Sequence, residues 1–206
     1  MKRMTSLIMA AGMCLTIAVS NLCGIVHDGK KLDELRESVL RMHVLANSDS
    51  DSDQKLKLLV RDALIERSSE IFGDAENFEQ ARDTAAENIV VIEKIAAEAL
   101  LENGCNAEVS TKITDMYFDE RVYGDITMPA GEYTAVRVEI GKAEGHNWWC
   151  VMYPPLCIPA ACEEYADDDK ETEDEFFSGD EKDILYHPQK FRVKFAVWEK
   201  LKDLFS

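Results

Sequence analysis

Residues 39–53 read Val39-Leu40-Arg41-Met42-His43-Val44-Leu45-Ala46 followed by Asn47-Ser48-Asp49-Ser50-Asp51-Ser52-Asp53, and the predicted architecture starts from these residues. The apolar first half of this stretch predicts a buried strand. Its second half consists of residues whose side chains compete for backbone hydrogen bonds, which favours a turn and a helix N-cap. The chain is therefore expected to enter a helix directly after a strand.

Two long helices are predicted after this turn. Residues 54–72 place apolar side chains at helical spacing, and Gly73 is a suitable C-terminal stop. Asn77 is suited to cap the next helix, which we expect to end at Asn103-Gly104. The apolar face of that helix consists of Phe78, Ala81, Ala85, Ile89, Ile92, Ala96 and Ala99.

Three strands are predicted beyond the helices, over residues 107–118, 132–140 and 148–153. Residues 128–131, Met-Pro-Ala-Gly, are typical of a turn. The order of one strand, two helices and three strands indicates an α+β fold. We expect an antiparallel or mixed sheet of about four strands, with the two long helices on one face.

The C-terminal part differs in composition. Residues 163–183 contain 12 acidic residues and two lysines, so the segment repels itself and is predicted to be a mobile loop. Residues 191–195 alternate like a strand. Phe195, Trp198, Leu201 and Phe205 then recur at helical spacing, which predicts a short C-terminal helix.

The N-terminus predicts export. Lys2 and Arg3 precede an apolar run over residues 7–19, and Ala18-Val19-Ser20 places small residues at positions −3 and −1 of a cleavage site after Ser20. Residues 1–20 are therefore predicted to be a signal peptide. Residues 21–206 are then a single extracytoplasmic α+β domain.

Two alternatives to cleavage after Ser20 exist. Residues 4–26 would form an uncleaved anchor, although polar residues dilute a stretch that barely reaches the roughly 20 apolar residues a span needs. A lipoprotein site at Cys23 is disfavoured because Asn21-Leu22 precedes it, where small residues are required.

The charge of the chain excludes some classes of partner. The 206 residues include 40 acidic and 23 basic ones, for a formal net charge of −17. Nucleic acid is not an expected partner, because binding phosphates needs clustered Lys and Arg. Docking on an anionic membrane surface is disfavoured for the same reason. No cofactor and no small-molecule substrate are indicated.

The cysteines allow two interpretations. Outside the cytoplasm, Cys150 and Cys157 are a natural disulfide pair, while the alternative is that one or both are small buried hydrophobic residues. No metal site is predicted, since the chain has no CxxC and no His pair at ligand spacing. A Cys/His hydrolase built on Cys150, with His146 or His43 as base, is an alternative function, although nothing marks an oxyanion hole.

The aspartates of residues 49–53 resemble the opening of a calcium loop. Gln54 and Val60 stand where such a loop needs glycine and a bidentate glutamate. We therefore expect the aspartates to stabilise a helix N-terminus instead.

Trp148 and Trp149 must point to opposite faces of their predicted strand, because successive strand residues alternate. One tryptophan can sit in the core. The other is either covered or exposed beside Pro154-Pro155, where a large aromatic side chain would suit a recognition surface.

Two segments resemble the bacterial stage II sporulation protein R (SpoIIR) family. The first consists of Leu40-Arg41-Met42-His43-Val44-Leu45-Ala46-Asn47-Ser48-Asp49-Ser50, continued by Asp53-Gln54-Lys55-Leu56-Lys57-Leu58-Leu59-Val60-Arg61-Asp62-Ala63. The second contains Met128-Pro129-Ala130-Gly131-Glu132-Tyr133, Asn147-Trp148-Trp149-Cys150 and Pro154-Pro155-Leu156-Cys157. The long acidic block of residues 163–183 departs from the family pattern.

The resemblance implies a signalling protein rather than an enzyme. Members are made in the forespore of an endospore-forming bacterium and exported to the space between forespore and mother cell. There they trigger a membrane-bound aspartic protease of the mother cell, SpoIIGA, to process the precursor of sigma-E. The family supplies no catalytic residues. We infer that partner contacts involve His43, Asn47, Trp148, Trp149, Pro154 and Pro155. A structural protein of the cell envelope is a third possibility.

Overall fold

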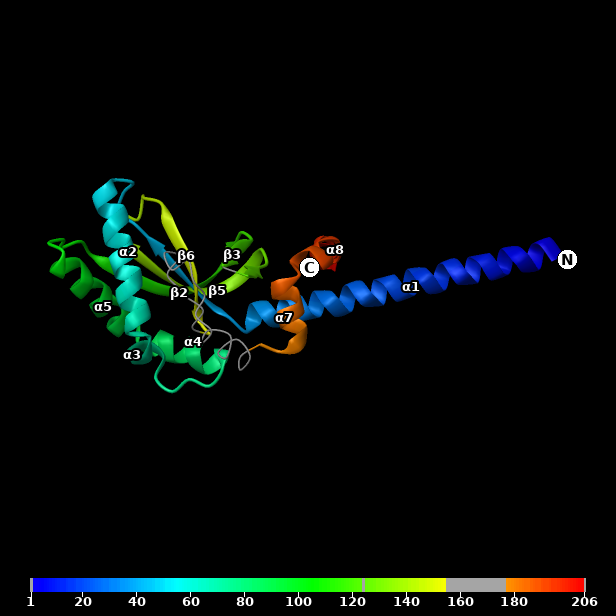
Figure 1. Cartoon of the computed structure of the whole chain (residues 1–206), viewed down its shortest axis with the longest axis horizontal. Helices are drawn as coiled ribbons and strands as arrows, with labels where there is room; N and C mark the ends of the chain where they lie inside the picture. The colour runs from blue at the N-terminus through cyan, green and yellow to red at the C-terminus, as the bar shows by residue number, and fades with distance from the viewer. Residues whose placement is uncertain (1, 124, 155–176, 206) are drawn as a thin grey trace. The chain divides into compact units, whose positions relative to one another are not determined.

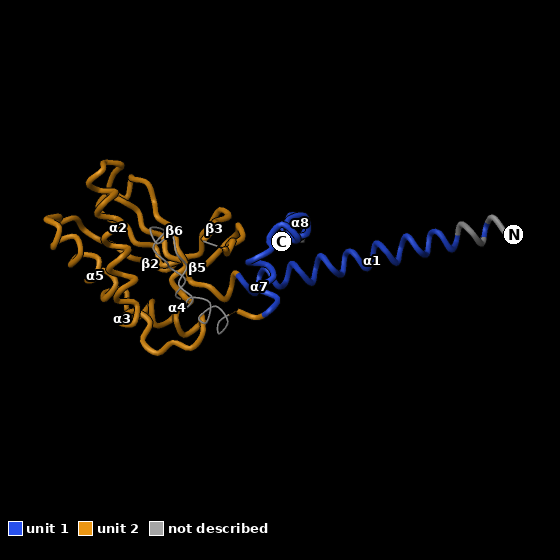
Figure 2. Tube along the Cα trace, in the orientation of Figure 1, with its two compact units in different colours: residues 1–35, 179–206 blue, residues 36–178 orange. Residues whose placement is uncertain are grey.

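The computed structural model describes residues 2–123, 125–154 and 177–205 (Figure 1). The chain divides into two compact units, one of residues 1–35 with 179–206 and the other of residues 36–178 (Figure 2). The single domain expected over residues 21–206 stays a prediction, because two compact units can belong to one domain.

The second unit is built on a four-stranded sheet. Its strands are β1 (Leu40–Leu45), β2 (Val109–Phe118), β5 (Gly131–Ile140) and β6 (Asn147–Tyr153), in the order β2-β5-β1-β6. β1 pairs in parallel with β5 and antiparallel with β6, and β2 pairs antiparallel with β5. The sheet is mixed, so the predicted α+β fold class is confirmed.

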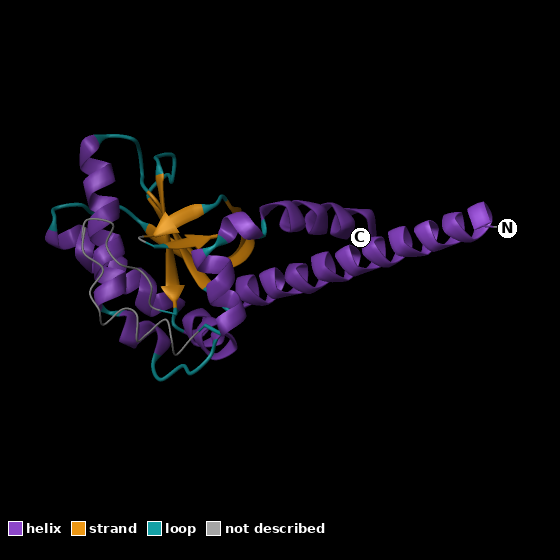
Figure 3. Ribbon diagram, turned by 45° about the vertical axis from the view of Figure 1, so that its right-hand side comes forward, coloured by secondary structure: helices purple, strands orange, loops and turns teal. Residues whose placement is uncertain are grey.

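The helices that follow β1 cover one face of this sheet (Figure 3). They are α2 (Asp51–Glu66), α3 (Ser68–Phe72), α4 (Phe78–Glu87) and α5 (Ile89–Glu102). Each of the two long helices predicted from the sequence is therefore interrupted once, at Arg67 and at Asn88. The Asn88 side-chain amide donates a hydrogen bond to the Ile71 carbonyl, 3.0 Å away, which ties the second interruption to α3.

The predicted cap at Asn77 and the predicted stops at Gly73 and Gly104 are confirmed, whereas the first helix begins at Asp51, three residues before the predicted start. The Ser50 hydroxyl accepts a hydrogen bond from the Asp53 N–H and caps α2, and the Asn77 side chain caps α4 in the same way through the Gln80 N–H. Gly73 and Gly104 follow α3 and α5 with φ of +57° and +74°. Glycine adopts these positive φ values without strain because it has no side chain.

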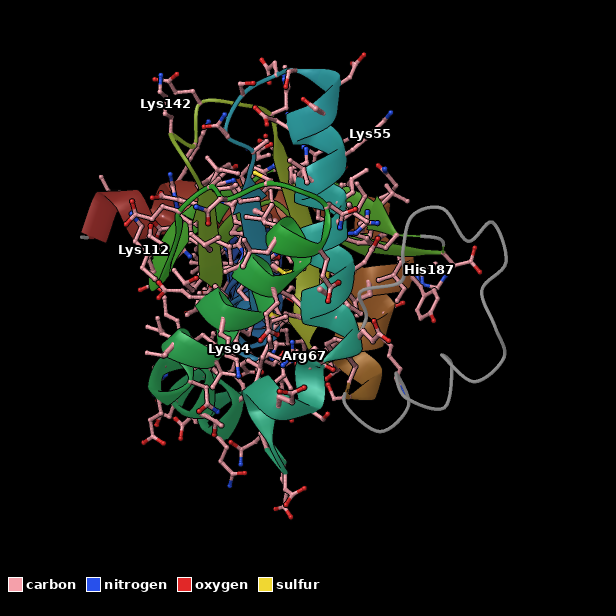
Figure 4. The ribbon with its side chains drawn as sticks, turned by 90° about the vertical axis from the view of Figure 1, so that its left-hand side faces the viewer. Lys55, Arg67, Lys94, Lys112, Lys142 and His187 are labelled. Carbon is pink, nitrogen blue, oxygen red and sulfur yellow. The ribbon has the colours of Figure 1, made fainter. Side chains whose placement is uncertain are left out.

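The helix-covered face is a hydrocarbon core. The even-numbered residues of β1 and the last three even-numbered residues of β5 are buried against α2–α5, and Met42 lies opposite Val136 and Cys150. At the outer surface of the helices, Arg67 and Lys94 both contact the Glu98 carboxylate, at 2.6 and 3.8 Å (Figure 4). The core includes Leu40, Met42, Val44, Val60, Leu64, Ile71, Ile92, Ile95, Ala96, Leu100, Val136, Val138 and Ile140.

A second sheet was not predicted from the sequence. β3 (Arg121–Tyr123) and β4 (Ile126–Met128) pair antiparallel with each other in a sheet of their own. Met128, which was assigned to a turn, ends β4, and Gly131 begins β5. Strands of three residues are too short to show an alternating pattern.

The first unit combines α1 (Lys2–Glu37) up to Leu35 with α7 (Gly179–Tyr186), the 3-10 turn η1 (Pro188–Lys190) and α8 (Arg192–Phe205). Ion pairs join Lys194 to Asp28 and Lys202 to Asp33. The Trp198 indole N–H donates to Asp33 at 2.9 Å. These contacts all lie beyond Ser20, the predicted cleavage position.

Two predictions for this unit require correction. The strand predicted over residues 191–195 is wrong, because Phe191 and Phe195 are four residues apart and stack at 5.5 Å at the start of a helix. The C-terminal helix itself is confirmed. The acidic loop is wrong for residues 179–183, which lie in α7, while residues 163–176 lie outside the described residues.

The N-terminal helix is apolar enough to cross a membrane. Residues 8–37 of α1 include an 18-residue stretch with a mean hydropathy of 1.9. A signal sequence and a membrane anchor both have this property.

Candidate functional site

The two faces of the four-stranded sheet separate the predicted site residues. Trp148 packs against the helix-covered core, whereas Trp149 lies on the other face with His43. Both tryptophans are half-buried, so neither is fully covered nor fully presented to solvent.

Aromatic rings gather on the face away from the helices. The ring of Trp149 lies 4.4 Å from that of His43 and 4.5 Å from that of Phe118. Tyr133 meets the edge of Phe118 at 5.8 Å. Five of the six strands contribute to this group, which we call the Phe118 cluster and which consists of Arg41, His43, Phe118, Tyr123, Tyr133 and Trp149.

Arg41 is the most buried cation of the cluster. Its side chain is 0% exposed, and its guanidinium carbon lies 4.2 Å from the Phe118 ring centre and 5.0 Å from that of Tyr133. Nη2 donates a hydrogen bond to the Tyr123 hydroxyl at 2.7 Å. Nε and Nη1 have no hydrogen-bond partner within the described part of the chain. A buried guanidinium with two unsatisfied nitrogens is unusual, since buried polar groups are normally paired.

His43 occupies the centre of the sheet, opposite Trp149 on β6 and Arg137 on β5. It is 3% exposed, and neither ring nitrogen has a partner among residues 2–123, 125–154 and 177–205. Burial, together with the nearby Arg137 charge, lowers the pKa of His43 to about 4, against a smaller opposing effect of Glu139. The imidazole is therefore neutral at pH 7 and lies in the interior of the cluster, and its predicted contact with a partner stays a prediction.

The Tyr133 side chain is held in the Phe118 cluster by a hydrogen bond of its hydroxyl. Its hydroxyl donates a hydrogen bond to the Pro129 carbonyl at 2.6 Å. Burial raises the pKa of Tyr133 to about 12, so the phenol stays protonated and keeps this donor at any physiological pH.

Asn47 organises the loops at one end of the sheet. Its amide donates to the Asp53 carboxylate at 2.8 Å, and its carbonyl oxygen accepts from the Lys142 N–H at 3.1 Å. A Cβ on Gly141 would lie 2.3 Å from that oxygen, so only glycine fits there. Asn47 is half-buried and thus has an evident structural role beside the predicted partner contact.

The aspartates of the turn are held by hydrogen bonds. The Ser48 hydroxyl and the Asn47 amide lower the pKa of Asp53, and the His146 side chain and backbone N–H lower that of Asp49. His146 Nδ1 lies 2.5 Å from the Asp49 carboxylate. The expectation that these aspartates stabilise a helix start is confirmed, because Asp51 and Asp53 occupy the first turn of α2.

Two cations of α2 lie at the start of β6, one over the Trp148 ring and one at the backbone just before it. The Arg61 guanidinium carbon is 4.4 Å from the indole ring centre, and Arg61 also pairs with Asp62 at 2.6 Å. Lys57 is buried and donates to the Gln54 side chain and to the His146 carbonyl at 2.6 and 3.1 Å. Burial lowers the pKa of Lys57.

Of the remaining predicted residues, the structure describes Pro154 and Cys150. Pro154 is buried, while Pro155 and Cys157 lie outside the described residues. Cys150 is disulfide-bonded, and its pairing with Cys157 stays a prediction. A disulfide-bonded cysteine offers no thiolate, and Cys150 faces the helices, on the side of the sheet opposite His43. The geometry therefore gives no support to a Cys/His hydrolase.

Four residues of the Phe118 cluster were not predicted from the sequence, namely Arg41, Phe118, Tyr123 and Tyr133. Arg41 and His43 alternate with apolar residues along β1, and this period of two places both side chains on the same face. That signal was available in the sequence. Phe118 and Tyr123 join the cluster only through the strand pairing, which the sequence does not give.

Comparison with known proteins identifies the family. The family model described as stage II sporulation protein R matches residues 36–163, more than half of the chain. Stage II sporulation protein R of Bacillus subtilis (strain 168) is 38% identical over 122 residues, which cover 59% of this chain and 54% of that relative. No solved structure matches. The chain belongs to the stage II sporulation protein R family.

Proposed function

We propose that this protein is an exported signal of endospore-forming bacteria, made in the forespore and acting in the space between forespore and mother cell. It activates the membrane-bound aspartic protease of the mother cell, of the SpoIIGA type, that processes the sigma-E precursor. The observation that carries the proposal is the family match over residues 36–163, which covers most of the second compact unit. The aligned region spans about half of the curated relative.

The apolar helix α1 supports export. It supplies either a signal sequence or an anchor that keeps the protein at the membrane. Because the ion pairs of Asp28 and Asp33 lie beyond residue 20, cleavage after Ser20 would leave the contacts of α8 in place.

Activation without catalysis requires preferential binding. A ligand shifts a protease towards its active form only if it binds that form more tightly than the inactive one. Aspartic proteases need two carboxylates that share a proton, so stabilising the pairing of two protease chains is the simplest route. The activator needs a binding surface for this task and no catalytic group.

Reconstitution in a non-sporulating bacterium tests the proposal. The full chain, the membrane protease and the sigma-factor precursor are co-expressed, and truncation of the precursor is followed by immunoblot. Control strains lack residues 1–20 of this chain or carry a protease whose catalytic aspartate is replaced by asparagine. Truncation should require the chain, its leader and the intact protease. Absence of truncation with all three proteins present and folded would contradict direct activation.

A further inference from the structure

Arg41 carries a buried positive charge with no counter-ion among the described residues. Glu139, a carboxylate on the same face, is engaged elsewhere, since it contacts Arg137 at 2.6 Å and Lys112 at 3.4 Å. Arg41 is 0% exposed and uses one of its three nitrogens, in the bond to Tyr123. Charged groups in protein interiors are normally paired, because an isolated charge is strongly disfavoured there.

Arg61, in the same compact unit, is a buried arginine whose charge is paired with a carboxylate. It is also buried and also lies over an aromatic ring, that of Trp148 on the helix-covered side of β6. Unlike Arg41, it contacts a carboxylate, Asp62, at 2.6 Å. The two arginines thus differ in the presence of an anion and not in burial or aromatic contact.

Other unsatisfied nitrogens surround the same ring. The Trp149 indole nitrogen and both His43 nitrogens lack partners within the described residues, and both rings contact Phe118. An indole N–H and a guanidinium only donate hydrogen bonds, so the group that completes this cluster must offer acceptors. A carboxylate provides up to four acceptor sites and matches the planar fork of an arginine.

The charge on this face also favours an anion. Arg41, Arg137 and Lys112 project from the face that bears the Phe118 cluster, with Glu139 as the acidic neighbour of the last two. This local excess of positive charge stands in a chain with a net charge of −17. Complementary charge at an interface favours the matching partner and disfavours others.

We propose that the Phe118 cluster is a recognition site for a carboxylate of the membrane protease, with Arg41 as the residue that receives it. This inference rests on the proposed function and names the chemistry of the contact. Tyr123 is the group that an incoming carboxylate would displace, because its hydroxyl accepts from Arg41 and donates to the Trp149 carbonyl at 3.3 Å. Its strand pairs with β4 and not with the four-stranded sheet, so its side chain can be displaced without breaking a strand pair of that sheet.

The test compares Arg41→Met with Arg61→Met in the reconstituted system, using the full chain. Both substitutions remove a buried guanidinium and keep an unbranched side chain. Arg41→Met should lower precursor truncation by at least about tenfold, as expected for loss of a desolvated charge contact. Its melting temperature should not fall, because removing an unpaired buried charge offsets the loss of the hydrogen bond to Tyr123 and of the contacts with the Phe118 and Tyr133 rings. Arg61→Met should keep truncation within about twofold of wild type. If Arg41→Met does not fold, Arg41→Lys keeps the charge but lacks the planar fork, and the same loss is expected.

A second set of variants identifies the carboxylate. Each Asp and Glu in the extracytoplasmic segments of the protease is changed singly to Asn or Gln. One of these changes should abolish truncation with the wild-type chain and add no further loss to Arg41→Met. If no protease carboxylate shows this coupling, the assignment is overturned.

The outcomes separate the two proposals. No truncation with the wild-type chain contradicts the proposed function. Normal truncation with a folded Arg41→Met variant leaves that function intact and overturns the carboxylate site.

Discussion

The two faces of the four-stranded sheet are built on different principles. On the helix-covered face, hydrocarbon side chains such as Leu64, Ile95 and Val138 are fully buried against one another. On the opposite face, Arg41 and His43 are buried to a similar degree with unsatisfied nitrogens. The first arrangement stabilises the fold. The second is unfavourable for stability by itself, which is typical of a surface prepared for binding.

The largest effect on stability is expected from the helix-covered face. Leu64→Ala leaves a cavity beside α5 and the sheet and should lower the free energy of unfolding by about 2–5 kcal/mol. Urea denaturation of the full chain in detergent, followed by tryptophan fluorescence, measures the change. Precursor truncation should return at lower temperature, because only folding is impaired. Lost truncation by a folded Leu64→Ala variant would assign this face to binding.

The opposite face should impose a pH dependence through His43. Its pKa is about 4 in the folded protein and 6.5 as the reference for the unfolded chain. Between these values the unfolded chain binds more protons, so stability falls as the pH falls from 6.5 to 4, by up to about 3 kcal/mol. His43→Gln should remove this part of the pH dependence, measured by urea denaturation at pH 7 and pH 4.5. A slope equal to that of wild type would contradict the assignment, and His187→Gln provides an exposed-histidine control.

A smaller effect on stability is expected at Asn47, which holds the loops at one end of the four-stranded sheet. Asn47→Ala removes the hydrogen bonds to Asp53 and to the Lys142 N–H and should destabilise the unit by about 1–2 kcal/mol. Thermal unfolding measures this loss. Asn47→Asp keeps an acceptor for Lys142 but places a carboxylate beside Asp53, and it should destabilise as well. Unchanged stability with lost truncation would instead make Asn47 a partner contact.

The smallest effect is expected at Tyr123. Tyr123→Phe removes one acceptor from Arg41 and one donor to the Trp149 carbonyl, for a loss of about 1 kcal/mol. Precursor truncation should stay at or above the wild-type level, because the hydroxyl competes with the incoming carboxylate. Truncation reduced in step with Arg41→Met would show that Tyr123 positions Arg41 and would contradict displacement.

Local chemistry made most of the fold predictable. Asn77 was recognised as a cap because its side chain acts three residues away, and Gly73 and Gly104 end helices for equally local reasons. The interruption at Asn88 was not predictable, because it depends on a hydrogen bond to Ile71, 17 residues earlier. Residues 191–195 alternate like a strand, but two phenylalanines four apart also suit a helix, and the helix prevails.

The site was predictable only in part. His43 and Trp149 were selected from the sequence, and the structure brings their rings together. Trp148 was selected with them, but the alternation of the strand sends it to the helix-covered face. Arg41 was not predicted as a site residue, because the sequence of an apolar strand does not show whether its arginine contacts a carboxylate. Such a contact depends on which carboxylates lie across neighbouring strands, which only the register reveals.

The most direct test of the difference between the faces is co-purification of the membrane protease with this chain. Both proteins are co-expressed, the membranes are solubilised in detergent, and the full chain is captured through a tag. The amount of protease recovered with it is then compared for wild type, Arg41→Met and Leu64→Ala at equal amounts of folded protein. The binding role of the Phe118 cluster predicts that Arg41→Met recovers protease only at background level while Leu64→Ala recovers it normally. Equal recovery by Arg41→Met and wild type would contradict that role.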